Sequence, residues 1–313
     1  LQALKTRDTN VVALCEDKVF KILANKDALY NADGSANVTA SNAVLGDAKA
    51  FAGDYGISSN PESLAVDGYR MYFTDKQRNK ILRLSQDGLT PISDIGMNSW
   101  ARENLGSALN LIGTFDEIKG EYNLSLTHGG KYGHGDTTVS FNEKSKGWSS
   151  FKSFIPEVGL SINDEYITGY EARIWSHHTK PGADGTPEAN NFYGIQSEST
   201  IDILFNDQPG AMKSFATMNY EGTQAGIRAF TTESGVYDAH GDLVTNDGAS
   251  GLNDGVYYNL VGKDGWSVRS FNTNLQEGKV GEFINKEGKW FNNILVISPA
   301  VQQVTLTISE NGE

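Results

Sequence analysis

The chain has 313 residues, enough to bury a sizeable core, and its 39 acidic against 26 basic side chains give a formal net charge of -13. A field of this sign repels phosphate backbones and anionic lipids, so nucleic acid is not expected as a partner. No apolar run approaches the roughly 20 residues that span a bilayer, so membrane insertion is not expected. The single cysteine, Cys15, excludes an internal disulfide framework and is predicted to be a small buried thiol in a strand.

The composition favours β structure, with 34 Gly, 13 Tyr and 14 Phe, and short apolar runs bounded by turn residues follow one another from the N-terminus. The first runs are VVALCE, KVFKILA, SLAVDG, RMYFTD, KILRLS and LTPIS. Turns between them are predicted at Asp17-Lys18, Asp33-Gly34, Asp67-Gly68 and Asp87-Gly88. Residues 31–63 interrupt this order as a long loop of small residues, expected on a surface or at an interface.

One short helix is predicted near residues 97–106, with Ser99 as its N-cap and Gly106 as its stop. Strand patterns resume after it. Tyr122, Leu124 and Leu126 alternate with polar neighbours, which is typical of a half-buried strand.

These patterns predict an all-β fold, with a β-propeller-like unit over residues 1–295 and a β-sandwich array as the alternative. Residues 296–313 are expected to open a following β segment, and the whole to be a fragment of a longer chain. The segments GWSSFKSF (147–154) and GWSVRSF (265–271) echo one another. Such recurrence fits a blade-type repeat, although a plain sandwich draws on the same residues.

The histidines were considered as metal ligands. His128, His134 and Asp136 lie in a glycine-rich stretch that lacks the rigid ligand spacing of a zinc site, so a flexible hairpin loop is favoured. His177 and His178 would face opposite sides of a strand, so a solvated strand end is favoured there.

Acidic residues offer two further possibilities. Residues 237–255 contain four candidate calcium ligands without the spacing of a helical calcium loop, and a mobile loop is favoured; they are Asp238, Asp242, Asp247 and Asp254. The pairs Asp116-Glu117 and Asp164-Glu165 would point to opposite faces of their strands, whereas glycosidase carboxylates must converge.

No nucleophile elbow, phosphate-binding glycine loop or HExxH motif is found, so we predict a protein that is not an enzyme. No catalytic, cofactor-binding or metal-binding residue is assigned. Four tryptophans are expected to anchor the packing between sheets, a sugar-binding platform being the alternative; they are Trp148, Trp175, Trp266 and Trp290.

Residues 69–93 resemble part of a known repeat family. Tyr72, Phe73, Thr74 and Asp75, followed by ILRLSQDG, resemble a blade of the YWTD or NHL-type β-propellers, with Phe73 where the family usually has Trp. The resemblance implies a propeller blade here.

A broader resemblance covers most of the chain, to about residue 295. The runs that carry it are VVALCEDKVFKILANKDALYNADG, NPESLAVDGYRMYFTDKQRN, RLSQDGLTPISDIGM, VSFNEKSKGWSSFKSFIPE and GEFINKEGKWFN. They resemble virion structural proteins of tailed bacteriophages, namely large structural proteins of marine cyanophages and tail muzzle proteins of crAss-like phages. The resemblance implies a homo-oligomeric, non-enzymatic tail component that contacts other tail proteins in the virion. The alternative is a tail-fibre module that binds a receptor or host surface glycan and is carbohydrate-active.

Overall fold

The structure is a computed structural model in which the chain divides into two compact units, residues 1–179 and 180–313. The all-β expectation is confirmed, because every ladder between named strands is antiparallel and α1 is the one α-helix in the part described. The described residues are 1–8, 10–23, 29–30, 36–37, 46–129, 135–179, 190–205, 208–211, 215–232, 235–237, 243–245, 255–259, 265–272, 277–278, 283–293 and 305–311.

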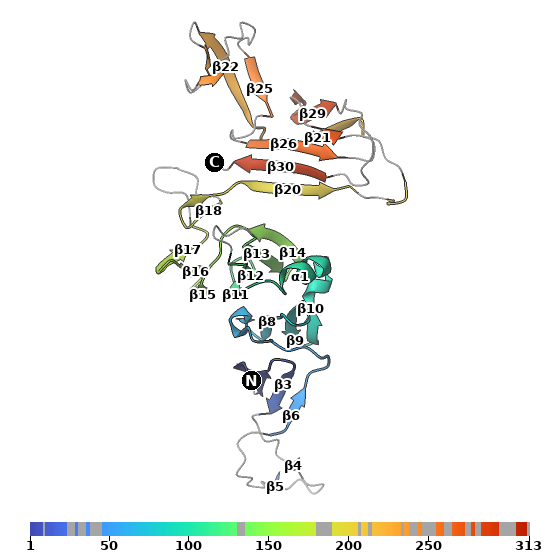
Figure 1. Cartoon of the computed structure of the whole chain (residues 1–313), viewed down its shortest axis with the longest axis vertical. Coiled ribbons are helices and arrows are strands. Elements are labelled where there is room, and N and C mark those ends of the chain that lie inside the picture. Colours follow the sequence, from blue (N-terminus) through green and yellow to red (C-terminus); the bar gives the residue numbers. More distant parts are fainter. Residues whose placement is uncertain are drawn as a thin grey trace. The chain divides into compact units, whose positions relative to one another are not determined.

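The first unit contains four sheets that follow one another in chain order, each with strands consecutive or nearly so in sequence (Figure 1). The first sheet comprises β1 (Ala3–Arg7), β2 (Asn10–Leu14), β3 (Val19–Leu23) and β6 (Ala48–Ala50). The second comprises β10 (Gly88–Pro91), β9 (Lys80–Ser85), β8 (Arg70–Asp75) and β7 (Ala65–Asp67). The third comprises β11 (Asn110–Asp116), β12 (Glu121–Thr127), β13 (Thr137–Asn142) and β14 (Gly147–Lys152). The fourth comprises β15 (Val158–Ile162), β16 (Glu165–Tyr170) and β17 (Arg173–Ser176).

Short helices connect these sheets, and a small two-stranded ladder lies apart from them. They are η1 (Pro61–Ser63), η2 (Ile92–Asp94), α1 (Asn98–Asn104), and β4 (Leu29–Tyr30) paired with β5 (Ala36–Asn37). The predicted helix is therefore present, but its N-cap is Met97, which makes no side-chain capping bond. Ser99 lies inside the helix, so its predicted capping role is wrong. None of the helices described is long and apolar enough to cross a membrane.

The first and second sheets pack face to face through an apolar cluster. Because side chains alternate along a strand, Met71 and Phe73 of β8 point toward the first sheet while Tyr72 points the other way. The buried members are Val12, Leu14, Val19, Ile57, Met71, Phe73, Leu82 and Leu84. The aromatic strand at 70–75 is thus buried on both faces.

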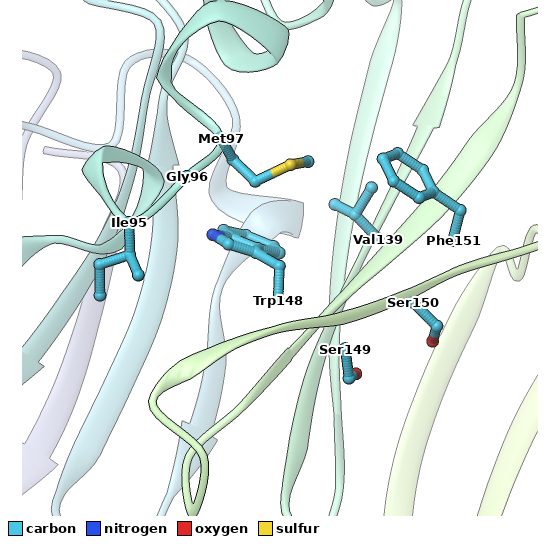
Figure 2. Close-up of a pocket in the computed structure, with 8 residues that line it drawn as sticks. All are labelled: Ile95, Gly96, Met97, Val139, Trp148, Ser149, Ser150 and Phe151. Atoms are coloured by element: carbon cyan, nitrogen blue, oxygen red, sulfur yellow. The ribbon is translucent and has the colours of Figure 1, made fainter. Parts of the chain in front are cut away.

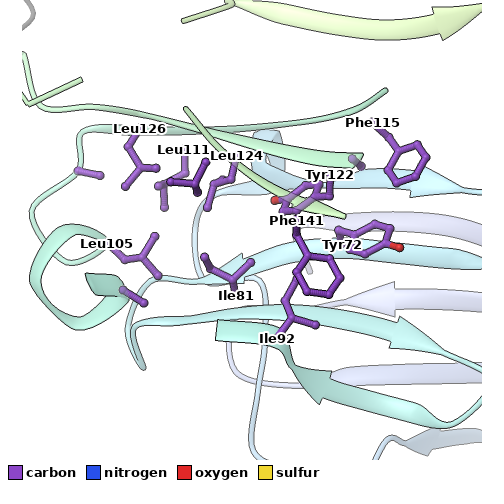
Figure 3. Close-up of a cluster of buried hydrophobic side chains, with 14 residues drawn as sticks. Tyr72, Ile81, Ile92, Leu105, Leu111, Phe115, Tyr122, Leu124, Leu126 and Phe141 are labelled. Atoms are coloured by element: carbon purple, nitrogen blue, oxygen red, sulfur yellow. The ribbon is translucent and has the colours of Figure 1, made fainter. Parts of the chain in front are cut away.

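The second and third sheets share the largest cluster of buried side chains in the first unit (Figure 3). Tyr72 stacks on Phe115 and Tyr122, with ring centroids 5.5 and 5.1 Å apart. The Tyr72 hydroxyl donates to Glu143 Oε2 at 2.8 Å, and burial together with Glu143 raises the pKa of Tyr72. Glu143 also accepts from Arg83 Nη1 at 2.7 Å and pairs with Arg70 Nε at 3.3 Å, so one carboxylate in the turn after β13 holds three side chains of the second sheet.

Close approach of β11 to η1 requires a glycine at position 113. A Cβ on Gly113 would lie 1.9 Å from the carbonyl oxygen of Ser63, which also accepts a 2.8 Å bond from the Tyr122 hydroxyl. The backbone of Ser63 cannot move away from position 113 without disturbing its hydrogen bond to Tyr122.

We therefore expect Gly113→Ala to lower the free energy of unfolding by about 1–3 kcal/mol through overpacking. Equilibrium urea unfolding followed by tryptophan fluorescence would measure the loss. Gly147→Ala is the matched control on the same sheet, because its Cβ would find its nearest neighbour at 3.8 Å. Equal effects of the two substitutions would contradict the close approach.

The second unit is built from further antiparallel sheets. One comprises β20 (Ser199–Leu204), β30 (Thr305–Asn311), β26 (Gly265–Asn272) and β27 (Glu277–Gly278). A second comprises β21 (Thr217–Tyr220), β29 (Lys289–Asn293) and β28 (Ile284–Lys286). The others comprise β24 (Leu243–Thr245), β23 (Gly235–Tyr237), β22 (Gly226–Thr232) and β25 (Gly255–Tyr258), and the pair β18 (Asn191–Phe192) and β19 (Ile195–Gln196).

The division between the units after Thr179 is not one that the sequence indicated. The boundary expected after residue 295 lies outside the described residues, and the segment beyond it supplies β30, an interior strand between β20 and β26. The two echoing segments both begin strands, but β14 is at the edge of its sheet and β26 is interior. They do not occupy equivalent positions.

Three further predictions are corrected. Cys15 follows β2 in a turn and is only partly buried, because the strand ends at Leu14. Within 31–63, residues 48–50 form β6, which pairs with β3, so the stretch is not wholly loop. The strand at 121–127 is buried on both faces because a fourth sheet covers the side that was expected to face solvent. The predicted turns at Gly68 and Gly88 are confirmed, with φ of 53° and 99°.

Candidate functional site

A layer of polar side chains that includes several titratable groups separates the third and fourth sheets. It arises from the alternation on β12, where Tyr122 and Leu124 face the second sheet and Asn123 and Ser125 face the fourth. We call this set the polar layer: Thr114, Asp116, Glu121, Asn123, Ser140, Lys152, Tyr166, Thr168, His177 and His178.

A buried ion pair anchors one end of the polar layer. Lys152 Nζ lies 2.7 Å from Glu121 Oε2, and their side chains are only 13% and 8% exposed. Burial lowers the pKa of Lys152, and the bond to Glu121 offsets part of this. Burial alone would raise the pKa of Glu121, but hydrogen bonds from Lys152 and Ser149 outweigh it and the pKa is lowered. The pair is therefore ionised and satisfied near neutral pH.

Tyr166 of the fourth sheet supplies the centre of the polar layer. Its hydroxyl forms a 2.7 Å bond with Thr114 Oγ1 and accepts a 3.3 Å bond from Asn123 Nδ2. Asn123 Oδ1 accepts from Ser140 Oγ at 2.6 Å and from Lys152 Nζ at 3.1 Å. One connected network thus reaches from the ion pair to the fourth sheet.

The two neighbouring histidines lie at the other end of the polar layer. The predicted solvated strand end is confirmed for His178, which is exposed, and is wrong for His177, which is partly buried. β17 ends at Ser176, and the positive φ of His178, 59°, turns the chain so that both rings lie near Tyr166. His177 Nε2 lies 2.7 Å from Thr168 Oγ1, and His178 Nε2 lies 2.7 Å from Asp116 Oδ2. The His177 ring also packs 4.9 Å from the ring of Phe154.

The environment of His177 predicts a stability that depends on pH. Burial and the neighbouring His178 lower the pKa of His177 to about 4. Between this value and its ordinary pKa of about 6.5, His177 is protonated in the unfolded chain but not in the folded chain. The free energy of unfolding therefore falls as the pH drops from about 6.5 to 4, by at most about 3 kcal/mol. Melting temperatures measured at pH 7 and pH 4.5 check this.

His177→Gln is expected to flatten the pH dependence because an amide keeps a hydrogen-bonding group near Thr168 but does not titrate. The difference between wild type and variant isolates the contribution of His177, because every other group is present in both. An unchanged pH slope in the variant would show that His177 is not the group responsible.

The polar layer links the third and fourth sheets through side-chain hydrogen bonds. Glu121 and Lys152 pair within the third sheet, whereas Asp116 and His178 pair across the interface. Within the described ranges no group of three or more His, Cys, Asp or Glu side chains is placed to hold a metal ion. Of the two acid pairs, Asp116 is buried against His178, while Glu117, Asp164 and Glu165 are exposed.

The other candidate ligands are only partly described. The backbone N–H of His128 donates to Asp136 Oδ1 at 2.7 Å, closing the base of the glycine-rich hairpin loop. His134 lies outside the described residues, as do His240 and all four aspartates proposed for calcium: Asp238, Asp242, Asp247 and Asp254.

A cavity of about 320 Å³ opens between β14 and the segment that joins η2 to α1 (Figure 2). Its walls are mainly apolar and include Met97, Trp148 and the 61% exposed Phe151. Trp148 is fixed there because its indole N–H donates to the Ile92 carbonyl at 3.2 Å. Ser149 and Ser150 add hydroxyl groups to one wall.

The remaining tryptophans serve packing. Trp266 and Trp290 pack against the buried pair Val268 and Phe283 in the second unit, and Trp175 of β17 is half-buried. The expectation that tryptophans anchor sheets is confirmed for Trp148, Trp266 and Trp290.

Asp75 is a key residue whose role the sequence did not reveal. Its fully buried carboxylate accepts four hydrogen bonds, from Gly56 N and Ser58 Oγ at 3.1 Å and from the backbone and Nη1 of Arg78 at 3.0 Å. It thereby ties the loop between the first two sheets to the turn after β8. The aromatic, Thr and Asp pattern at 72–75 was the available signal, but it carried no indication of these partners.

No protein-family model and no curated protein matches the sequence. The proposals that follow therefore depend on the residues, the sheets and their surfaces.

Proposed function

We propose that this chain is a non-enzymatic structural component of a bacteriophage tail, of the muzzle, nozzle or tail-tip type. It forms a homo-oligomer in the virion and contacts other tail proteins. The observation that carries the proposal is the serial packing of sheets in residues 1–179, in which a central strand of each inner sheet, β8 or β12, is buried on both faces. Such an arrangement satisfies many backbone hydrogen bonds and builds a rigid body around its inter-sheet contacts.

We further propose that the four sheets are blades of a β-propeller-like arc. Two features support this finer fold: the second and third sheets are four-stranded meanders, and the first strands of successive sheets, β7, β11 and β15, lie next to one another. Adjacent first strands are what blades arranged around a common axis require. The described sheets do not form a closed ring.

Cryo-electron microscopy of virions that carry this chain tests the tail proposal. We expect density for a ring or sleeve of identical subunits around the tail axis, into which residues 1–179 fit. Density confined to the ends of peripheral fibres would overturn the scaffold function.

Glycan binding is a second candidate function, favoured by the aromatic cavity beside β14. Trp148 and Phe151 offer apolar ring surfaces and Ser150 a neighbouring hydroxyl, a combination that suits a sugar ring. Phe151→Ala removes exposed surface without opening the core. Saturable binding of a host surface polysaccharide that is lost in this variant would support the second candidate, while binding unaffected by the variant would remove the cavity from consideration.

A further inference from the structure

Three side chains of the polar layer bring an amine, an amide and a carboxylate together within the third sheet. Lys152 Nζ lies 2.7 Å from Glu121 Oε2 and 3.1 Å from Asn123 Oδ1. Glu121 and Asn123 belong to β12, whereas Lys152 ends β14, which lies two strands away across β13. A nucleophilic amine therefore lies beside both an electrophilic amide and a group that can take its proton.

We propose that Lys152 and Asn123 form an intramolecular isopeptide bond in the folded chain, with Glu121 transferring the protons. The reaction exchanges one C–N bond for another and needs no oxidant, reductant or further reactant. It occurs once in each chain, so it does not make the protein an enzyme.

The protons and bonds of this reaction balance. Lys152 first gives a proton to Glu121, which leaves a neutral amine and a neutral carboxylic acid. The Nζ lone pair then attacks Cγ of Asn123. Glu121 donates its proton to Nδ2 and takes another from Nζ, and the bond between Cγ and Nδ2 breaks. Nδ2 leaves as ammonia, Nζ keeps one hydrogen in the new amide, and Glu121 ends protonated.

Burial of the three groups favours this chemistry. Asn123 is fully buried, and the side chains of Lys152 and Glu121 are 13% and 8% exposed. Burial lowers the pKa of Lys152, so its neutral amine is more accessible than that of a surface lysine. Burial alone would raise the pKa of Glu121, but hydrogen bonds from Lys152 and Ser149 lower it, so the neutral pair is the minor form. The bond therefore forms slowly, and the freshly folded chain holds the ion pair.

The amide of Asn123 is held at both ends. Its Oδ1 accepts from Ser140 Oγ at 2.6 Å, which polarises the carbonyl group, and its Nδ2 donates to the Tyr166 hydroxyl at 3.3 Å. Cγ is one C=O bond beyond Oδ1 and so lies within about 4.3 Å of Nζ. Rotation about the terminal bonds of the flexible Lys152 side chain can bring Nζ closer. The ring of Phe154, with its centroid 5.9 Å from Nζ, adds an apolar neighbour.

A second trio in the first unit has the same chemical groups at the surface and serves as a control within the same chain. Lys80 Nζ contacts the carboxylate of Asp94 and lies 3.3 Å from Asn98 Oδ1. Asp94 and Asn98 are exposed, so water stabilises the charged form of Lys80, which is not a nucleophile. No bond is expected between Lys80 and Asn98.

The proposed bond would staple the third sheet. It joins residues 29 apart in the sequence and connects β12 to β14 across β13. The edge strand β14 could then not be pulled from the sheet without breaking a covalent bond. This inference goes beyond the proposed function and holds whether or not the chain belongs to a tail.

Mass spectrometry of the intact chain tests the bond. The full chain is kept folded at mildly alkaline pH and physiological temperature, and its mass is followed over several days. We expect the loss of one ammonia, about 17 Da. Trypsin should then release peptide 120–131 joined to peptide 147–173, because it no longer cleaves after Lys152. An unchanged mass of the folded chain would overturn the proposal.

Two variants each remove one chemical function from the trio. Glu121→Gln removes the proton acceptor and is expected to slow the reaction at least about a hundredfold. Lys152→Arg keeps a positive charge but has no primary amine, so its mass should not change. Circular dichroism shows whether each variant is folded, and the wild-type chain in urea, where the three groups are apart, should also keep its mass. A wild-type rate in Glu121→Gln would overturn the role of Glu121.

The site of any linkage decides between the remaining outcomes. Loss of one water, about 18 Da, with Lys152 joined to Glu121 would overturn the choice of Asn123 as the electrophile. Linkage of Lys80 to Asn98 at the same rate would overturn the requirement for burial. Linkage of Lys152 to Asn123 alone is the expected result.

Discussion

Replacing Asp75 by alanine is expected to lower the free energy of unfolding by about 3–5 kcal/mol, because a buried carboxylate with four hydrogen bonds is removed. The substitution leaves Gly56 N–H and the Ser58 hydroxyl without this acceptor in a buried place between two sheets. The side chain of Arg78 is 34% exposed and can be hydrated in the variant, which offsets part of the loss in stability. Equilibrium urea unfolding followed by tryptophan fluorescence gives the difference.

The chain contains a matched control for this experiment. Asp67 also pairs with an arginine three residues further on, Arg70, but its side chain is 26% exposed and its ion pair lies near solvent. Asp67→Ala is expected to cost at most about 1 kcal/mol. A comparable loss in both variants would show that the arginine pair, and not the link to the loop at 56–58, accounts for the stability.

The second large effect is expected at the buried ion pair of the polar layer. Lys152→Met leaves the carboxylate of Glu121 buried with its main counter-charge gone, and such a break costs about 3–5 kcal/mol. In this variant the pKa of Glu121 should rise, because burial then acts without the opposing bond from Lys152. The loss should therefore be smaller at low pH, where Glu121 is protonated.

A double variant distinguishes two causes of this loss: the missing bond between Lys152 and Glu121, and the unpaired buried charge that remains on Glu121. Glu121→Gln combined with Lys152→Met removes both charges and should recover most of the stability lost in Lys152→Met alone. Lys289→Met serves as the exposed control, since Lys289 and Glu221 form a 2.8 Å pair with side chains 50% and 69% exposed, and no measurable change is expected there. If the double variant were as unstable as Lys152→Met alone, the unpaired charge of Glu121 would not be the cause of the loss.

Local sequence patterns were sufficient to predict those elements whose backbone conformation is controlled by the local sequence. The hairpin strands at 70–75, 80–85 and 88–91 follow aromatic and aliphatic runs closed by turn residues. The helix at 98–104 was predicted from a capping serine and a following glycine, and it forms although Ser99 is not its cap. β6 was missed because Ala48 and Ala50 have little intrinsic preference for strands, and the strand forms only through pairing with β3.

The polar layer could not be predicted because its polar residues alternate with apolar ones as they do on a solvated strand. Asn123 and Ser125 are buried only because the fourth sheet covers them, and that sheet is some forty residues further along the chain. The histidine pair was misjudged for a related reason. A strand geometry was assumed at 177–178, but β17 ends at Ser176, and with His178 in a left-handed conformation both rings lie near Tyr166.

The serial packing of the first unit has a consequence for how such a chain changes its length. Inner sheets contact their neighbours along the series, so stability is close to a sum of nearest-neighbour terms, as in repeat proteins. Gain or loss of a pair of hairpins at one terminus then changes the number of sheets, while the strand pairing within the remaining sheets is unchanged. The number of sheets in such a unit would therefore change in whole steps when a terminal hairpin pair is duplicated or deleted.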